Sequence, residues 1–365
     1  MRINSIELKN FRNIDSAKID FDHDINIFIG NNGQGKTNLI ESFYLLSLCR
    51  SFRTRQMGQL VQFEKEFASV KGNIESNKKN LDLEVVLTSK SKKAKINHQD
   101  ISKVSDFVGY LNVVVFTPDD LSLVKNGPQL RRRLMDEELG KISPVYLFNI
   151  SKYNKLLKER NAFLKRMKET NKSKDLYLDV LNEQMASLQK GIITKRKIFV
   201  ENLSNIASEI YGILSNHDAT LNIHYQCFVK GEDYEKEILD QYSKSIYKDI
   251  KYTSTSIGVQ KDDLIIELDH KSASQFASQG QQRTIVLAIK IALLELIKKE
   301  IGEYPVLLLD DVLSELDRNR KMMLLKFLNE RIQTFITTTS LDDIDEILLQ
   351  KARMYDVECG KIKEE

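Results

Sequence analysis

Apolar and polar residues alternate near the start of the chain and again after residue 250, a spacing typical of β-strands. Before residue 120 we predict strands that begin at Ile3 and span 25–29, 67–74, 81–87 and 111–116, with a hairpin near 92–99. After residue 250 we predict strands at 264–268, 306–309, 335–339 and 354–358. Both ends of the chain therefore contribute strands to an α/β fold.

The middle of the chain has the apolar spacing of helices instead. Residues 121–211 contain only three glycines and two prolines, so few positions there would interrupt a helix. One apolar stripe runs from Tyr153 to Met167 and a second from Tyr177 to Ile192, separated by the polar residues 169–175. We predict two antiparallel helices that form an arm too short to be a long coiled coil. The predicted parts are a first half of an α/β domain (1–117), a mainly helical insertion lobe (118–250) and the second half (251–365).

A phosphate-binding loop follows the strand predicted at 25–29. It consists of Gly30, Asn31, Asn32, Gly33, Gln34, Gly35, Lys36 and Thr37, which match the pattern G-x-x-x-x-G-K-[ST]. The glycines let backbone N–H groups point at phosphates, and the following helix presents its positive end to the same anion. Lys36 can reach the β- and γ-phosphates and Thr37 can bind Mg²⁺, so the loop predicts a nucleotide site.

Two acids end the buried strand predicted at 306–309. Such a strand beside the phosphate-loop strand would deliver Asp310 to the Mg²⁺ ion, and Asp311 could orient or deprotonate the attacking water. Alone, the pair could be two acids that end a strand. Together with the phosphate loop, they indicate a nucleotide hydrolase.

A third motif begins a predicted helix about 30 residues before the acidic strand. Ser278 can donate its hydroxyl to a phosphate, Gly280 permits close backbone approach, and Gln281 follows in the first turn. Alone, the segment could be a polar helix cap. Its place before the acidic strand favours a second phosphate contact.

These three motifs together resemble those of ABC-type ATPases, in which the segment at Ser278 would be the signature and 314–317 the D-loop. More closely, the chain resembles the RecF family over nearly its whole length. Residues 6–13 are similar to the first strand of RecF, SMC and related DNA-repair heads. The matching motifs are the Walker A loop at 30–41, the segment that replaces a Q-loop at 115–121, the signature at 277–284, and the Walker B strand with the D-loop at 308–317.

The resemblance implies a head that dimerises around ATP and Mg²⁺, because a signature in this fold binds the nucleotide of the opposite subunit. It further implies a weak DNA-dependent ATPase that binds single-stranded, gapped or junction DNA and promotes recombinase loading, with hydrolysis releasing it. Partners of the RecO and RecR type, and roles in fork recovery and the SOS response, also follow from the resemblance.

Two departures from the family pattern stand out. Residues 258–263 read Gly-Val-Gln-Lys-Asp-Asp where the family has Gly-Pro-His-Arg-Asp-Asp, which puts a His-Arg role there in doubt although Lys261 keeps a positive charge. Asp311 replaces the glutamate of transport-type ABC proteins, and no glutamine stands at the Q-loop position. Because the shorter carboxylate reaches less far, we expect slow turnover.

Composition indicates the cellular location more clearly than the binding partner. No apolar run is long enough for a membrane span, and the sparse cysteines Cys49, Cys227 and Cys359 favour a reducing cytoplasm. The net charge of +3 says little, but basic residues cluster locally. Candidate DNA contacts are Arg53, Arg55, Lys92, Lys93, Lys95, Arg131, Arg132, Arg133 and a helical stripe formed by Lys152, Lys155, Lys158, Arg160, Lys165, Arg166, Lys168, Lys172 and Lys174. Each could equally be a solvated charge, and Arg131 to Arg133 could instead join the helical lobe to the head.

Other classes fit less well. A transporter ATPase has an intact head and a Q-loop glutamine, an SMC protein has hundreds of coiled-coil residues, and an ABC-plus-toprim nuclease has a further acidic domain. Another SMC-like chromosome-associated ATPase stays open. So does a nucleotide-gated DNA-binding platform with negligible turnover.

Overall fold

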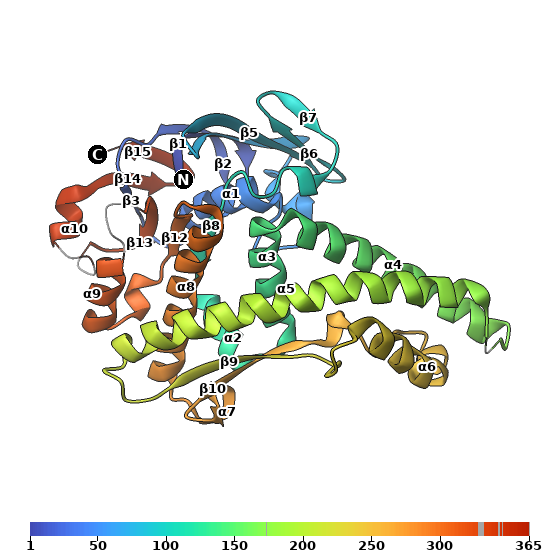
Figure 1. Cartoon of the computed structure of the whole chain (residues 1–365). Helices are drawn as coiled ribbons and strands as arrows, with labels where there is room; N and C mark the ends of the chain where they lie inside the picture. The colour runs from blue at the N-terminus through green and yellow to red at the C-terminus, as the bar shows by residue number, and fades with distance from the viewer. Residues whose placement is uncertain (173, 328–331, 342–343, 345, 365) are drawn as a thin grey trace. The chain divides into compact units, whose positions relative to one another are not determined.

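The computed structural model describes residues 1–172, 174–327, 332–341, 344 and 346–364 (Figure 1). The chain forms two compact units. Unit 1 comprises Met1–Leu121, Glu209–Asp218 and Ser278–Glu365, and unit 2 comprises Ser122–Ser208 and Ala219–Ala277. The three-part division drawn from the sequence stays a prediction.

A largely parallel sheet forms the centre of unit 1, in the order β15-β14-β3-β13-β12-β8. Its strands are β3 (Ile25–Ile29), β8 (Val113–Phe116), β12 (Val306–Asp310), β13 (Thr334–Thr338), β14 (Ala352–Glu358) and β15 (Lys361–Glu364). Strands β12 and β13 are buried along their whole length, as parallel strands covered on both faces are. Because β3, β13 and β12 run parallel, their carboxyl ends meet at one edge, where the nucleotide motifs lie.

An antiparallel sheet in the order β2-β1-β4-β5-β6-β7 packs with the parallel sheet in one core. Its strands are β1 (Arg2–Phe11), β2 (Ile14–Asp20), β4 (Phe67–Ser76), β5 (Lys79–Thr88), β6 (Lys92–Ile96) and β7 (Gln99–Ile101). Alternate residues of β4 and β5 are buried, which is the pattern that identified them in the sequence. The stacked rings of Phe43 and Phe335, 4.4 Å apart, join helix α1 (Lys36–Leu48) to β13 within that core.

Helix α8 (Gln279–Ile301) is the other long helix that begins in unit 1. Its central positions from Thr284 to Leu294 are buried all round, as expected of a helix inside a domain. The shorter elements are η1 (Met57–Leu60), η2 (Val104–Asp106), η3 (Pro118–Leu121), η5 (Leu313–Glu315), α9 (Arg318–Phe327) and α10 (Glu346–Lys351). The mixed α/β fold predicted from the sequence is confirmed, and β2 and β15 are additions to it.

Unit 2 contains the predicted arm. Helix α4 (Pro144–Glu169) turns back through a polar connection into α5 (Leu176–Leu214), which is longer than its predicted stripe and ends in unit 1 (Figure 1). Other helices are α2 (Ser122–Lys125), α3 (Pro128–Ile142), α6 (Tyr234–Tyr252), α7 (Ala273–Phe276) and η4 (Val259–Lys261). A small sheet of β9 (Leu221–Gln226), β10 (Asp263–Leu268) and β11 (Lys271–Ser272) lies within this unit, and β9 was not predicted.

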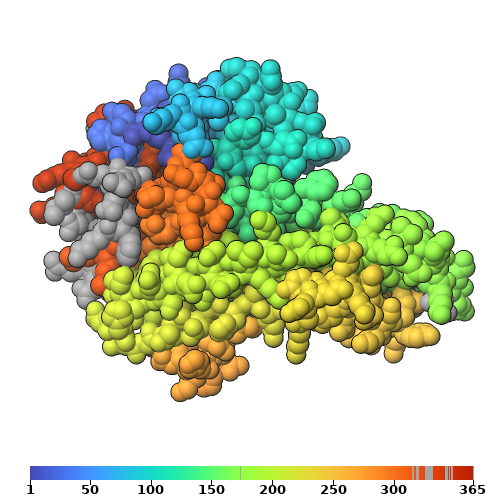
Figure 2. All heavy atoms as spheres, in the orientation of Figure 1, coloured from blue at the N-terminus to red at the C-terminus, as the bar shows by residue number. Residues whose placement is uncertain are grey.

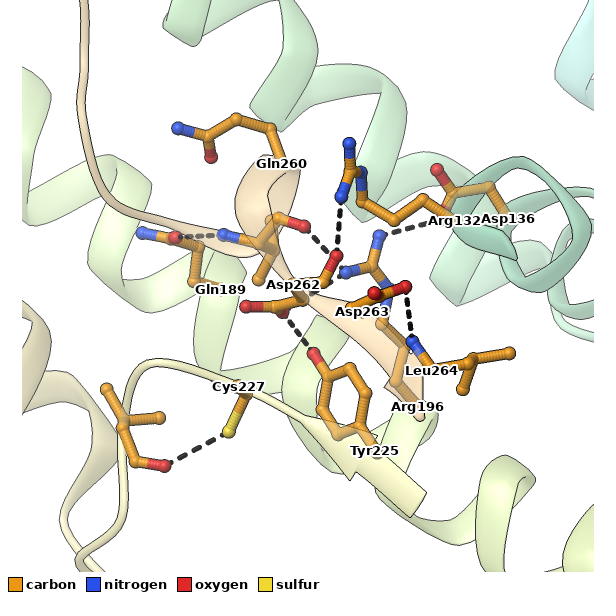
Figure 3. Close-up of polar contacts among 12 residues, drawn as sticks. Arg132, Asp136, Gln189, Arg196, Tyr225, Cys227, Gln260, Asp262, Asp263 and Leu264 are labelled. Carbon is orange, nitrogen blue, oxygen red and sulfur yellow. Dashed lines mark hydrogen bonds and ion pairs between the residues drawn. The ribbon is translucent and has the colours of Figure 1, made fainter. Parts of the chain in front are cut away.

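A buried polar cluster holds unit 2 together (Figure 3). Arg196 of α5 donates to Asp136 of α3 at 2.8 Å, to Asp262 at 3.2 Å and to the carbonyl of Val259 at 2.8 Å. Asp262 also accepts a hydrogen bond from the hydroxyl of Tyr225 on β9. The cluster therefore fixes α3, α5, β9 and the segment before β10 to one another, and it uses residues of the 258–263 motif to do so.

Candidate nucleotide site

The phosphate loop joins β3 to α1 and depends on two glycines. A β-carbon at Gly30, whose φ is 159°, would lie 2.3 Å from the carbonyl oxygen of Val357 on β14. One at Gly35, whose φ is 118°, would lie 2.8 Å from Asn13 Oδ1. A side chain at either position would displace the loop, so the spacing of these glycines follows from the close packing around it.

Two neighbouring turns hold the loop from outside. The carbonyl of Gln34 accepts hydrogen bonds from Asn13 Nδ2 at 3.0 Å and from the Gly360 N–H at 2.8 Å. The Gln34 side chain accepts another from the Cys359 N–H at 2.6 Å. Asn38 of α1 donates to Asn13 at 2.8 Å, so the loop, the β1–β2 turn and the β14–β15 turn form one hydrogen-bonded unit.

Lys36 is folded across the mouth of the loop and is 4% exposed. Its Nζ donates to the carbonyls of Gly30 at 2.6 Å and Asn31 at 3.1 Å. These carbonyls hold the ammonium where the bound phosphates are expected. A phosphate would offer it charged acceptors, which form stronger hydrogen bonds than neutral carbonyls.

The end of β12 places Asp310 beside Thr37. Thr37 Oγ1 donates to Asp310 Oδ1 at 3.0 Å, and Thr337 Oγ1 on β13 donates to the same oxygen at 2.8 Å. Burial raises the pKa of the Asp310 carboxyl, and the hydrogen bonds from the two threonines lower it in part. A carboxylate and a hydroxyl side by side are hard oxygen donors, so these residues would fit Mg²⁺.

Asp311 has a left-handed backbone, with φ 53°. This conformation costs energy in a residue other than glycine. Two hydrogen bonds hold it: the Asp311 N–H donates to Thr337 Oγ1 at 3.0 Å, and Ser314 Oγ donates to the Asp311 carbonyl at 2.8 Å. The single hydroxyl of Thr337 therefore contacts both acids.

Ser278 is the N-cap of α8. Its hydroxyl accepts the Gln281 N–H at 3.2 Å, and the Gln281 side chain accepts the Ser278 N–H at 2.9 Å, so the two form a capping box. In the same turn, Thr284 Oγ1 donates to the Gly280 carbonyl at 2.9 Å and accepts from Arg320 Nε at 2.8 Å. Arg320 also contacts Asp317 of the D-loop.

The sequence predicted no individual role for four residues at the motifs: Asn13, Asn38, Thr337 and Arg320. Asn13 ends the stretch 6–13, and Asn38 directly follows Thr37. The signal available for both was therefore that they lie in or beside a motif. Thr337 and Arg320 reach the site only through the sheet order and the packing of α9. Glu315 of the D-loop has a side chain outside the described set.

The predicted DNA contacts fall into different environments. Arg160 is fully buried and pairs with Asp249 at 2.9 Å, so its assignment to an exposed phosphate-binding stripe was wrong. The reason is periodicity: position 160 lies four residues from the buried Leu156 and Leu164 and shares their face of α4. The other lysines and the arginine of that stripe are exposed.

Most of the basic residues outside the stripe form hydrogen bonds or ion pairs within their own unit. Arg131 donates to Asp263 through Nε and Nη2, both at 2.8 Å, and Arg132 donates to the Asp262 carbonyl at 2.7 Å. These contacts, and the 2.7 Å pair of Arg133 with Glu137, lie inside unit 2. Arg53 of unit 1 donates to Asn38 Oδ1 at 2.7 Å and is 42% exposed.

None of the described helices has the length and apolar character that a bilayer crossing requires. Within the same residues, histidine, cysteine and acidic side chains nowhere gather in groups of three that could bind a metal.

Comparisons with known proteins agree with this geometry. Residues 2–361 match the RecF/RecN/SMC N terminal domain. The chain is 41% identical to the DNA replication and repair protein RecF of Oceanobacillus iheyensis and 40% identical to that of Staphylococcus carnosus, in each case over 99% of this chain and 100% of the relative.

Solved structures give the same result. The recombination mediator protein RecF-ATP in the RecFOR pathway superposes with a TM-score of 0.92 at 33% identity, covering 100% of this chain and 97% of the other. A Pyrococcus furiosus Smc head domain has a TM-score of 0.56 at 15% identity, covering 100% and 95%, which shows a shared fold alone.

Proposed function

Because the chain belongs to the RecF family of DNA replication and repair proteins, we propose that it is an ATP-dependent, DNA-binding recombination mediator. It would bind single-stranded, gapped or junction DNA as an ATP-bound homodimer in the cytoplasm, promote recombinase loading, and leave the DNA after slow, DNA-dependent hydrolysis. RecO- and RecR-type proteins would be its partners, as the RecFOR pathway named for the similar structures suggests.

The observation that carries the proposal is the contact between Thr37 and Asp310, which joins motifs 273 residues apart. Lys36 would bind the β- and γ-phosphates, while Thr37 and Asp310 would hold Mg²⁺. When bound, the ion would supply positive charge that stabilises the negative charge developing as the γ-phosphate leaves. Asp311 would orient or deprotonate the attacking water.

The signature supports the dimer. Ser278 and Gly280 stand at the start of a 23-residue helix, where N–H groups and the helix dipole favour an anion. We assign Ser278, Gly280 and Gln281 to the γ-phosphate of the ATP bound by a second copy. In this arrangement residues 1–117 and 251–365 supply the head and residues 118–250 the lobe.

Fluorescence anisotropy of labelled gapped DNA, at one fixed salt with and without Mg-ATP, tests the proposal. We expect ATP to tighten binding and Ser278→Arg to abolish that gain while leaving ATP affinity intact. An ATP-induced dimer in Ser278→Arg contradicts the assignment of the signature. DNA binding that is identical without nucleotide contradicts the ATP switch.

The shorter carboxylate of Asp311 favours a second candidate, a DNA-binding platform gated by nucleotide with negligible turnover. Phosphate release during DNA binding separates the two functions. Release that is stimulated by DNA supports the ATPase, and ATP-driven dimerisation with no release supports the platform.

A further inference from the structure

The last turns of α6 carry a strongly basic surface with exposed aromatic rings. Lys244, Tyr247, Lys248 and Lys251 stand at i, i+3, i+4 and i+7, so they share one face of the helix. All four are exposed, and so is the final residue, Tyr252. Together with Lys168 at the end of α4 they form what we call the tip surface: Lys168, Lys244, Tyr247, Lys248, Lys251 and Tyr252.

The tip surface is one continuous patch because α4 and α6 are fixed to each other. Lys168 Nζ donates to the Lys251 carbonyl at 2.9 Å, and Lys251 Nζ lies 5.6 Å from the Tyr252 ring centre. Below it, Ile246 and Ile250 pack against Leu164 and Met167. In Figure 2 the yellow atoms of α6 reach the surface next to the green atoms of the arm.

Acidic residues are sparse around the patch on α6, where the nearest exposed acid, Asp240, lies one turn before Lys244. The only acid between residues 241 and 252 is Asp249, which is fully buried and paired with Arg160 at 2.9 Å. The four exposed lysines therefore outnumber the exposed acids beside them, Asp240 and Glu169, and the patch keeps a net positive charge. Basic residues also stabilise the C-terminal end of a helix dipole, but that effect is confined to the last turn and does not extend to Lys244.

The exposed tyrosines indicate which kind of polyanion the tip surface binds. Tyr247 is 75% exposed and Tyr252 is 64% exposed, so two flat rings stand in water between lysines. An acidic protein segment would need only the lysines, which pair with its carboxylates, and would not require the exposed rings. Unpaired bases stack on exposed aromatic rings while their phosphates bind lysines, whereas the bases of a duplex are already stacked on each other. We propose that the tip surface binds single-stranded nucleic acid, with Tyr247 and Tyr252 stacking on bases.

This inference extends the proposed function by adding a second nucleic-acid contact that needs no nucleotide. The probe is a fluorescein-labelled dT 20-mer, titrated with the full chain without ATP, and an abasic oligomer of equal length serves as a second probe. Tyr247→Ala/Tyr252→Ala should weaken dT binding about 30-fold or more, since each of the two stacked bases contributes at least about 1 kcal/mol and 1.4 kcal/mol corresponds to about tenfold in affinity. The same variant should bind the abasic oligomer as the unmodified protein does.

Matched controls separate charge from stacking. Lys244→Gln/Lys248→Gln/Lys251→Gln should weaken both oligomers and lower the salt slope by about 2. Tyr110→Ala, an exposed tyrosine in unit 1, and Lys236→Gln, an exposed lysine in the first turns of α6, should change neither. Since all these side chains are exposed, the variants should melt at the temperature of the unmodified chain.

Two results would overturn the proposal. One is unchanged dT affinity in the double tyrosine variant. The other is a loss of polyglutamate binding in that variant without a loss of dT binding, because it would assign the surface to an acidic protein segment. The proposed ATP switch is tested separately, since the tyrosine variant should keep the gain in affinity that ATP gives on gapped DNA and Ser278→Arg should keep the nucleotide-free binding to dT.

Discussion

The candidate nucleotide site of unit 1 and the polar cluster of unit 2 are both built around a buried aspartate, but different groups surround its charge. Asp262 lies beside the guanidinium of Arg196, which also pairs with Asp136. Asp310 instead receives two threonine hydroxyls, and Lys36 is bonded to loop carbonyls. A cluster that satisfies its own charges stabilises a fold. A cluster that leaves a carboxylate facing only hydroxyls is suited to binding a cation with its ligand.

The largest expected effect is on the unit 2 cluster. Arg196→Met leaves Asp136 and Asp262 without their shared cation, and removing one partner of a buried ion pair costs about 3–5 kcal/mol of unfolding free energy. Urea unfolding at neutral pH measures the loss. Lys195→Met changes the exposed neighbour on α5 and should stay within about 0.5 kcal/mol. A loss below about 1 kcal/mol in Arg196→Met would show that the cluster does not hold unit 2 together.

At the candidate nucleotide site, loss of the aspartate charge should weaken ligand binding and leave the unfolding free energy intact. Asp310→Asn removes a carboxylate whose pKa burial raises, so unfolding free energy should stay the same or increase slightly. Affinity for ATP in the presence of Mg²⁺ should fall about 10- to 100-fold, the range for a lost charged contact. Calorimetric titrations with and without Mg²⁺ test this. Asp311→Asn is the control and should bind Mg-ATP normally and accumulate as a closed dimer. An Asp310→Asn protein that keeps Mg²⁺-dependent affinity would exclude Asp310 from the ion site.

A smaller effect is expected at the signature. Thr284→Val removes the hydroxyl that joins Arg320 to the Gly280 carbonyl, and a lost neutral hydrogen bond costs about 0.5–1.5 kcal/mol. ATP-induced dimerisation, followed by light scattering, should weaken about three- to tenfold while the ATP affinity of the monomer stays constant. Thr194→Val is matched, because exposed Thr194 bonds the carbonyl four residues earlier in the same way. Equal dimerisation in both variants would contradict a role for the Arg320–Thr284 contact.

A further effect is a pH dependence of stability. Burial raises the pKa of Asp262 to about 6. Since the native state holds this proton more tightly than the unfolded chain, the stabilisation is complete below about pH 4 and decreases as pH rises through about 6. Asp262→Asn should remove this term. The unfolding free energy of the variant should then fall less between pH 4 and 6 than that of the unmodified chain, and parallel pH profiles would exclude Asp262 as its source.

The sequence predicted those features whose residues are close together along the chain. The strand, loop and helix around Lys36 are contiguous, and the apolar run before Asp310 identified its strand. Thr337 could not be found in this way, because its place between the two motifs depends on β13 pairing with both β3 and β12. The apolar stripe that Arg160 shares predicts that its side chain is buried, but we assigned it to the surface because it is charged. Strand β9 alternates in the expected way and was missed because it follows a long helix.

The sheet order β3-β13-β12 also has a consequence for biosynthesis. The ribosome completes the Walker A loop early, yet the strands that flank β3 on both sides, β13 and β14, are among the last to be made. A nascent chain that ends before residue 334 lacks the Thr337 hydroxyl and both neighbours of β3. We therefore expect nucleotide binding to await near-complete translation, which would keep unfinished chains from entering the proposed ATP-dependent cycle.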